Sequence, residues 1–316
     1  MVLKYDTRVV VLVGGVGGAK LAYGLSRLLS SVQLTLIGNV GDDLEHFGLR
    51  ISPDLDTVMY TLAGLANPQT GWGIVGDTWQ VVESLQRFGE DAWFRIGDRD
   101  VATHLLRTLW LERGLTLTAV TARLLRGLNV AYNLLPVTDD PLATMIDTVD
   151  AGTLAFQEYF VRRRWEPAAL RIWFRGAEQA RMTDAVRNAL TNADVIIIGP
   201  SNPLLSIAPI LAVPGVRELI EQRRGACVAL SPLIRGKAVK GPADKLMREL
   251  GHDVSARGIA RFYEGLIDGL MIDEQDRKEA DSVGVPVRVT RTLMQNDVEK
   301  TRVANELLEW VEGMML

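Results

Sequence analysis

The sequence predicts an α/β fold: a mostly parallel sheet with helices on both faces and an inserted, mainly helical cap subdomain. Three observations lead to this prediction. The first fifty residues alternate strand, glycine turn, amphipathic helix and strand, and the same alternation returns after about residue 188. Between about residues 70 and 187, helical patterns dominate instead. Short β-rich runs separated by helices are typical of a parallel sheet that is covered on both faces.

The elements of the predicted sheet follow one another along the chain. The first strand covers residues 9–13, a helix follows over 19–29, and the second strand covers 34–38. Each strand is a short aliphatic run, as expected for strands that are buried on both faces. Further strands are predicted from the runs at 194–199, 226–231, 268–273 and 286–290, and a helical pattern over 296–313 closes the chain.

The predicted cap separates the two parts of this sheet in the sequence. Its helical stretches cover residues 101–114 and 116–128, and its strand candidates cover 130–137 and 153–161. No linker rich in proline, glycine or serine sets it apart. We therefore interpret residues 1–316 as a single domain, with a core of about residues 1–69 and 188–316 and a cap insertion of about residues 70–187 that returns into the parent sheet.

The composition narrows the class of protein. With 47% hydrophobic and 23% charged residues, the chain is expected to be a soluble globular protein, and no apolar run approaches the roughly 20 residues of a membrane span. The N-terminus shows no export signal, so a cytoplasmic location is expected. The net charge of −4 is spread without a basic tract, which argues against a nucleic-acid partner. A single cysteine, Cys227, excludes an internal disulfide and a cysteine-cluster metal site.

A glycine-rich turn joins the first strand to the first helix. The segment GGVGGAK spans residues 14–20, and its glycines let backbone N–H groups approach an anion closely at a helix N-terminus. Phosphate is the expected guest. The segment lacks both common fingerprints, because Lys20 stands where a dinucleotide turn has glycine, and Ala19 and Leu21 stand where a P-loop has glycine and a hydroxyl residue. It is therefore a phosphate turn of another kind or a tight structural turn.

Carboxylates gather in the segments that follow the second strand. Asn39, Asp42 and Asp43 come directly after it, at the edge where open α/β sheets bind ligands. They could bind Mg²⁺ or a ribose hydroxyl, or act only as turn formers. Asp54 and Asp56 lie in the first turn of a predicted helix, where an acidic residue also favours the helix dipole. Several carboxylates that face a phosphate turn favour a divalent metal.

Further polar residues occur in three other segments. Arg95 precedes a dense polar loop, and arginine suits a diphosphate because its planar fork donates in pairs. His104 lies among leucines and is interpreted as structural, and with three histidines in the chain a histidine-rich metal site is excluded. Ser201 and Asn202, between prolines, could hydrogen-bond a base or phosphate, or simply form a rigid loop. Lys240 adds a cation near the same edge.

Ten segments match the pattern of one known family, in order along nearly the whole chain: GGVGGAKLA, NVGDD, SPDLDTVMYTLAG, WGIVGDTW, GDRDVATHLLR, LLPVTDDP, FQEYFV, GPSNPLLSIAPIL, LSPLIRGKAVKGPADKLM and DGLMID. They resemble the CofD/FbiA family, the 2-phospho-L-lactate transferases of coenzyme F-420 biosynthesis. The motifs SPDLDT, GDRD followed by ATH, and GPSNP are the most specific. The resemblance implies a Rossmann-like core with an added subdomain, and a homodimer.

The resemblance also implies a reaction. The donor is 2-phospholactate, or its enolpyruvyl analogue, joined to GMP so that the two phosphates form a guanosine diphosphate; the acceptor is the ribityl hydroxyl of the deazaflavin FO, and GMP is released. The cofactor is Mg²⁺. The forms GGVGGAK and NVGDDL look like the bacterial branch, whose members are often linked to phosphoenolpyruvate, so the donor stays open between the two. The chain is thus expected to be a transferase of a substituted phosphate group with small-molecule partners.

Roles for individual residues follow from the same resemblance. Asp56 and Arg95 match the acidic and the basic residue with which the family contacts FO, and Thr57 is expected to face the same cleft. Asp56 and Asp54 are the expected catalytic residues. The expected metal ligands are Asp42, Asp43 and Asp54, and the expected donor-binding residues are Gly14, Gly15, Gly17, Gly18, Lys20, Asn39, Ser201 and Asn202.

Two other functions are weighed against this one. CofD-like proteins include a group of regulators that bind nucleotide-sugars without catalysis and that resemble this chain at the glycine turn, but SPDLDT with GDRDVATH argues against that group. A nicotinamide dehydrogenase is disfavoured by the failed dinucleotide fingerprint.

Overall fold

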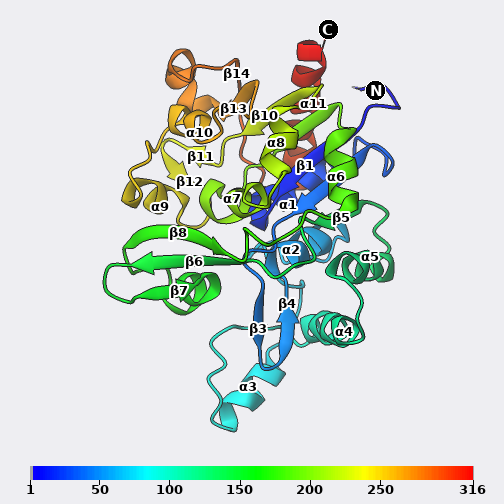
Figure 1. The fold of residues 1–316 in the computed structure, drawn as a ribbon, viewed down its shortest axis with the longest axis vertical. Coiled ribbons are helices and arrows are strands. Elements are labelled where there is room, and N and C mark those ends of the chain that lie inside the picture. Colours follow the sequence, from blue (N-terminus) through cyan, green and yellow to red (C-terminus); the bar gives the residue numbers. More distant parts are fainter. Residues whose placement is uncertain (1–2, 316) are drawn as a thin grey trace.

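The computed structural model describes residues 3–315. Its centre is a seven-stranded sheet in the order β14-β13-β10-β9-β1-β2-β5, and all six pairings are parallel (Figure 1). The strands are β1 (Val9–Val13), β2 (Leu34–Gly38), β5 (Asn133–Pro136), β9 (Val195–Ile198), β10 (Ala226–Leu230), β13 (Gly269–Asp273) and β14 (Val287–Thr290). The predicted parallel α/β sheet is confirmed.

Helices cover both faces of this sheet. Helix α1 packs against α2 and α11, whereas α8 packs against α6 and α7. The chain steps from β1 to β2 in one direction across the sheet and from β9 to β10 in the other, so right-handed crossovers place α1 and α8 on opposite faces. These helices are α1 (Gly15–Ser26), α2 (Pro53–Leu62), α6 (Asp184–Thr191), α7 (Ala208–Leu211), α8 (Val216–Glu221) and α11 (Asp297–Met315).

Shorter elements lie in the C-terminal half of the chain, outside the central sheet. They are a π-helical turn η2 (Pro203–Ile207), the hairpin strands β11 (Leu233–Ile234) and β12 (Lys237–Ala238), the helices α9 (Ala243–Glu249) and α10 (Ala256–Phe262), and the 3-10 segment η3 (Glu274–Ser282). Within residues 3–315, none of the helices has the length and apolar composition that a membrane span needs.

The inserted segment begins with three helices, α3 (Gln80–Arg87), α4 (Asp100–Glu112) and α5 (Leu117–Gly127). It then contributes β5 to the parent sheet, beside β2. A three-stranded antiparallel sheet follows in the order β7-β6-β8, formed by β6 (Ala143–Thr148), β7 (Thr153–Ala155) and β8 (Ala169–Arg175). In Figure 1 this sheet lies to the left of the core, while α3, α4 and α5 lie below and to the right of it.

The strand predicted over residues 153–161 is wrong after Ala155. The chain turns there into a π-helical segment, η1 (Glu158–Arg162). Phe156 and Phe160 are four residues apart, and their rings stack at 5.3 Å on one side of the turn. Residues four apart lie on the same side of a helix, whereas a strand would separate them by more than 13 Å at about 3.3 Å per residue. The aromatic spacing therefore favours a helical turn over the predicted strand.

A β-hairpin carries the chain from the sheet to α2. Its strands are β3 (Leu44–His46) and β4 (Leu49–Ile51), and Phe47 and Gly48 at its tip have positive φ angles of 51° and 72°. Two successive residues with positive φ are characteristic of a tight hairpin turn. The hairpin projects from the core toward α3 (Figure 1). The polar segments before and after it are thereby held at the same edge of the sheet.

Candidate active site

Helix α1 begins at Gly15, four residues before the predicted start, so the glycine turn consists of Gly14 and the first turn of α1. Its backbone contacts the protein's own polar groups. The amide of Gly14 donates to Ser201 Oγ (3.1 Å), and that hydroxyl donates back to the Gly14 carbonyl (2.8 Å). The amide of Gly15 donates to Asp54 Oδ1 (2.6 Å). The first N–H groups of a helix have no intrahelical partner, and here a carboxylate takes one of them. The turn therefore joins β1 to α2 and to the loop after β9.

Close packing explains why glycine is required in this turn. A Cβ on Gly14 would lie 2.4 Å from Asp54 Oδ2, and a Cβ on Gly17 would lie 2.2 Å from the Pro200 carbonyl oxygen. A Cβ on Gly18 would lie 2.5 Å from the Ser201 hydroxyl oxygen. The missing side chains let the turn contact the two neighbouring loops directly.

Asn39 connects the segment after β2 to α2. It is fully buried, and its Nδ2 donates to Asp54 Oδ2 (2.9 Å) and to Asp42 Oδ1 (3.3 Å). Its own Oδ1 accepts from the amide of Gly41 (2.8 Å). One amide side chain thus brings together two of the predicted metal ligands beside the glycine turn.

Three carboxylates in this region lack a cationic partner, and we call Asp42, Asp43 and Asp54 the unpaired carboxylates. None of the ion pairs among residues 3–315 involves them. Asp43 Oδ2 accepts from Ser52 Oγ (2.7 Å), but its Oδ1 is buried without a partner. The three carboxyl groups thus lie close together in a largely buried region, where their negative charges would repel one another.

This environment raises the pKa of each unpaired carboxylate. Burial, followed by the charges of Asp54 and Asp43, raises the pKa of Asp42 well above its usual range. Burial raises the pKa of Asp43 in the same way, although the Ser52 hydrogen bond and the charge of Arg107 oppose it. Burial raises the pKa of Asp54 to about 6 against the hydrogen bonds from Asn39, Gly15 and Ser206.

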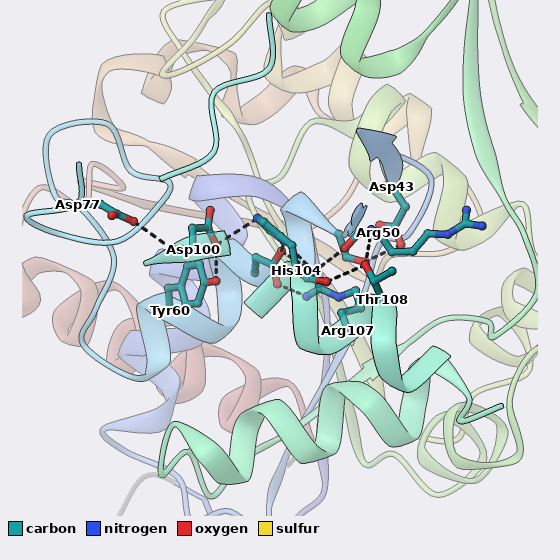
Figure 2. Close-up of polar contacts among 10 residues, drawn as sticks. Asp43, Arg50, Tyr60, Asp77, Asp100, His104, Arg107 and Thr108 are labelled. Carbon is teal, nitrogen blue, oxygen red and sulfur yellow. Dashed lines mark hydrogen bonds and ion pairs between the residues drawn. The ribbon is translucent and has the colours of Figure 1, made fainter. Parts of the chain in front are cut away.

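Asp56 has the opposite surroundings. Arg107 of α4, with 1% of its surface exposed, donates from Nη1 to Asp56 Oδ2 (3.0 Å) and from Nη2 to Oδ1 (Figure 2). Burial lowers the pKa of Arg107, but the charges of Asp56 and Asp43 and the hydrogen bonds to Asp56 together outweigh burial and raise that pKa above its usual value. The guanidinium therefore stays charged and both oxygens of Asp56 are engaged.

A second carboxylate in the same network is held by side-chain donors as well, and we call Asp56 and Asp100, whose oxygens accept from side chains of this network, the paired carboxylates. His104 Nε2 lies 3.3 Å from Asp100 Oδ1, and the Tyr60 hydroxyl donates to the same oxygen (Figure 2). Burial raises the pKa of Asp100, but the hydrogen bonds from His104 and Tyr60, together with the charge of Arg107, outweigh burial and hold that pKa below its usual value. The amide of Asp100 donates to Asp77 Oδ2 (3.2 Å), which ties α4 to the preceding loop.

The other predicted site residues lie outside these contacts. No hydrogen bond or ion pair in residues 3–315 joins Arg95 to Asp56, and the Arg95 guanidinium lies over the Trp79 ring, 6.0 Å from its centroid. Thr57 is buried next to Asp56 on α2. Asn202 caps η2 by accepting from the amides of Leu204 and Leu205. Lys20 is half-buried on α1, where burial and the nearby Lys300 lower its pKa.

The sequence analysis did not assign Arg107 or Tyr60 to the site, and it treated His104 as structural. The spacing of polar residues along α4 could have indicated Arg107 and His104. Asp100, His104 and Arg107 are separated by four and three residues, so they share one face of α4. Three polar residues on one face of a helix that is otherwise rich in leucine indicate a buried polar network.

The oxygen ligands of this site do not form a finished metal cage. Within residues 3–315, no three side chains of His, Cys, Asp or Glu converge in a metal-binding arrangement. Mg²⁺ is usually bound by one or two carboxylates together with phosphate oxygens and water. The unpaired carboxylates, with a buried oxygen of Asp43 that lacks a partner, fit that smaller requirement.

Comparisons with known proteins identify the family of the chain. Residues 9–308 match the family model described as 2-phospho-L-lactate transferase CofD. The chain is 42% identical over 314 residues to a phosphoenolpyruvate transferase of Streptomyces griseus subsp. griseus, which covers 96% of this chain and 98% of that protein. It is 37% identical over 305 residues to a 2-phospho-L-lactate transferase of Methanocaldococcus jannaschii, with 96% and 97% covered.

The fold is also found among solved structures. A crystal structure of a member of the upf0052 family from Bacillus halodurans superposes with a TM-score of 0.64 and 17% sequence identity, covering 96% of this chain and 99% of that chain. At this identity the likeness concerns the fold, and it agrees with the parallel sheet described above.

Proposed function

The chain belongs to the CofD family of 2-phospho-L-lactate transferases, and from this premise we propose which reaction it catalyses. It transfers the 2-phospholactyl or enolpyruvyl-phosphate group from a guanosine diphosphate-linked donor to the ribityl hydroxyl of FO, in coenzyme F-420 biosynthesis. The hydroxyl oxygen attacks the phosphorus that bears the lactyl or enolpyruvyl group. The phosphoanhydride bond breaks, GMP leaves with the bonding electrons, and the hydroxyl proton passes to a carboxylate of the site.

One observation carries this proposal: the unpaired carboxylates lie directly beside the glycine turn. Asp54 contacts the turn through the amide of Gly15, and Asn39 links Asp54 to Asp42. An anionic diphosphate would be repelled by three carboxylates unless a cation lay between them. A site that joins carboxylates to a phosphate turn therefore favours transfer of a phosphate-linked group with a divalent metal.

One or two of the predicted ligands Asp42, Asp43 and Asp54 would hold the magnesium ion, together with phosphate oxygens of the donor and water. Bound there, it would neutralise charge on the donor diphosphate during cleavage. The free Oδ1 of Asp43 supports this assignment, because a buried carboxylate oxygen without a donor is costly unless a ligand completes it.

The donor phosphates would bind at the exposed side of the glycine turn. The amides of Gly14 and Gly15 already donate to Ser201 and Asp54. Ser201 and Asn202 contact the neighbouring backbone and so shape the turn. The donor phosphates would therefore lie near Gly17 and Gly18. Lys20 would supply a positive charge. Lys240 faces it from the loop after β12, and burial, followed by the charge of Lys20, lowers the Lys240 pKa. A phosphate between two lysines would relieve their repulsion.

Asp56 would orient the acceptor hydroxyl through the lone pairs that Arg107 leaves open, with Thr57 beside it. Arg95, on the loop over Trp79, would contact the deazaflavin from the other side. Catalysis would rest on positioning and on charge neutralisation, which supply most of the rate in phosphoryl transfer. Asp56 would also be the carboxylate that accepts the hydroxyl proton.

Product analysis by mass spectrometry tests the proposal. The protein is incubated with FO and Mg²⁺ and, in separate tubes, with the phospholactate and the phosphoenolpyruvate forms of the guanosine diphosphate donor. We expect a phosphodiester adduct of FO and free GMP in at least one tube, no adduct after EDTA treatment, and unchanged yield for Arg50→Ala, whose side chain pairs with the exposed Glu45.

The absence of adduct in both tubes, with folded protein, would contradict the proposal. The assignment would then move to the nucleotide-sugar-binding regulator, and a thermal-shift comparison of UDP-sugars with guanosine diphosphate would test it. The homodimer stays a prediction, which size-exclusion chromatography with light scattering would check.

A further inference from the structure

Two side chains on one face of α4 determine how Asp56 is held. The Arg107 fork contacts both carboxylate oxygens, and the pair is buried, with 1% of Arg107 and 4% of Asp56 exposed. A bidentate contact fixes the plane of a carboxylate as well as its position. Arg107 Nη1 also lies 3.4 Å from the Arg50 carbonyl oxygen, which links the same guanidinium to the β3–β4 hairpin.

His104 contacts the same guanidinium nitrogen that donates to Asp56 Oδ2. Its Nδ1 lies 3.2 Å from Arg107 Nη1 and 3.7 Å from Asp56 Oδ2, and the longer distance exceeds that of a hydrogen bond. A guanidinium carries donors only, so the ring nitrogen that faces it must accept. The proton of a neutral imidazole then sits on Nε2, which lies 3.3 Å from the acceptor Asp100 Oδ1.

We infer that Arg107 is the positioning residue for Asp56, and that His104, kept as the Nε2–H imidazole between Arg107 and Asp100, keeps the guanidinium aimed at that carboxylate. Neither residue touches a reacting atom, and both act through Asp56. The inference rests on the proposed function, because it takes Asp56 to orient the acceptor hydroxyl.

A purely structural role explains this arrangement less well. Replacing a buried ion pair by apolar side chains of similar volume is often neutral for stability. Here the pair is retained although Arg107 Nε is buried without a partner. His104 contacts Arg107 through Nδ1 and Asp100 through Nε2. These contacts fix the orientation of the guanidinium more than they add to stability. Such an arrangement suits a carboxylate whose orientation matters.

Steady-state kinetics of Arg107→Lys and Arg107→Met test the role of the fork. Lysine keeps the charge but offers a point donor, so we expect kcat to fall about 10-fold with lysine and about 100-fold with methionine, while KM for FO changes by less than about 3-fold. Guanidinium chloride at low concentration should restore part of the kcat of Arg107→Ala, whereas urea at the same concentration should not. A thermal melt of each variant controls for folding.

The ¹⁵N NMR signals of the histidine rings test the role of His104 without any turnover. The chain has three histidines, His46, His104 and His252, so His104→Gln assigns the signal. We expect a proton on Nε2 and none on Nδ1 in the wild type at neutral pH, and a loss of this preference in Arg107→Met.

An imidazolium or an Nδ1–H ring at His104 would overturn the inference, as would full kcat in both Arg107→Lys and Arg107→Met. A wild type that forms no FO adduct would instead contradict the proposed function, and the ring signals would then decide the Arg107–His104 arrangement by themselves. A parallel fall of kcat and thermal stability in Arg107→Met, with full activity in Arg107→Lys, would indicate a structural role only and overturn the inference.

Discussion

Asp54 and Asp56 lie two residues apart on α2 and have opposite surroundings. Two residues correspond to about 200° around a helix, so their side chains point to different sides. Asp54 points to the glycine turn and to Asn39, and it belongs to the unpaired carboxylates. Asp56 points to α4, where Arg107 compensates its charge. Burial is similar on the two sides, with 8% of Asp54 and 4% of Asp56 exposed.

The two aspartates therefore differ in whether a neighbouring donor or cation compensates the carboxylate charge, and not in burial alone. Both oxygens of Asp56 and Oδ1 of Asp100 are engaged by donors of α4 and Tyr60, so the paired carboxylates are suited to fix geometry. The unpaired carboxylates have raised pKa values and an oxygen without a donor, so they are suited to receive a cation.

Asp43→Asn should lower activity most. It removes a charge from the unpaired side while leaving an oxygen that can accept from Ser52. Loss of one electrostatic contact in an active site typically costs about 100-fold to 1,000-fold in kcat, and we expect the upper end here. The melting temperature without metal should stay the same or rise, because repulsion with Asp42 and Asp54 falls. A steep loss of stability in this variant would place Asp43 among the paired carboxylates.

Asp56→Asn should lower the free energy of unfolding by about 3 to 5 kcal/mol, because it leaves the buried Arg107 without its counter-charge. Urea unfolding monitored by tryptophan fluorescence measures this change. The double variant Asp56→Asn with Arg107→Met should regain most of the stability, since no lone charge stays buried. If the double variant is less stable than Asp56→Asn, the compensation argument is wrong.

The stability of the metal-free protein should fall as pH rises through the range where Asp54 ionises. Its pKa is about 6 in the folded state against 3.8 ordinarily, so the folded state binds the proton more tightly. The stabilisation is fully present below about pH 4 and is lost as pH passes 6, which amounts to about 3 kcal/mol at 1.36 kcal/mol per pKa unit. Urea titrations at several pH values should show this slope, and Asp54→Asn should remove the part of it that Asp54 contributes, leaving the part from Asp42 and Asp43, whose pKa values are also raised.

Arg50→Ala should change the free energy of unfolding least, by about 0.5 kcal/mol or less, as is usual for exposed ion pairs. Arg50 pairs with Glu45 at 3.1 Å, and the two side chains are 59% and 53% exposed. The variant keeps the Arg50 backbone groups that contact Thr108 and Arg107. A change close to that of Asp56→Asn would mean that the hairpin, and not burial of charge, stabilises this region.

The parallel sheet could be predicted from the sequence because its strands are buried on both faces and therefore read as unbroken aliphatic runs, such as Val195–Ile198. The meeting of Asp42 with Asp54 could be anticipated, since both follow strands or turns at one edge of the sheet. Their link through Asn39, by contrast, is a tertiary contact between segments 15 residues apart. No periodicity in the sequence encodes it.

The Arg107–His104 arrangement escaped prediction for a different reason. Arg107 lies among apolar residues of α4, and its partner Asp56 lies 51 positions earlier. Sequence patterns show which residues share one helix face, but not which face of another helix they meet. The strand assigned to residues 153–161 failed because contacts between aromatic rings decided the local conformation, and those depend on side-chain packing.

The close packing of Gly14, Gly17 and Gly18 has a consequence for distant relatives of this protein. Each glycine is demanded by the chain's own atoms, by Asp54, the Pro200 carbonyl and Ser201, before any ligand is considered. A relative that had lost its donor would still need small residues at these positions to fold. Searches for further transferases among divergent genomes should therefore weigh the aspartates at 42, 43 and 54 above the glycine pattern, which reports architecture more than chemistry.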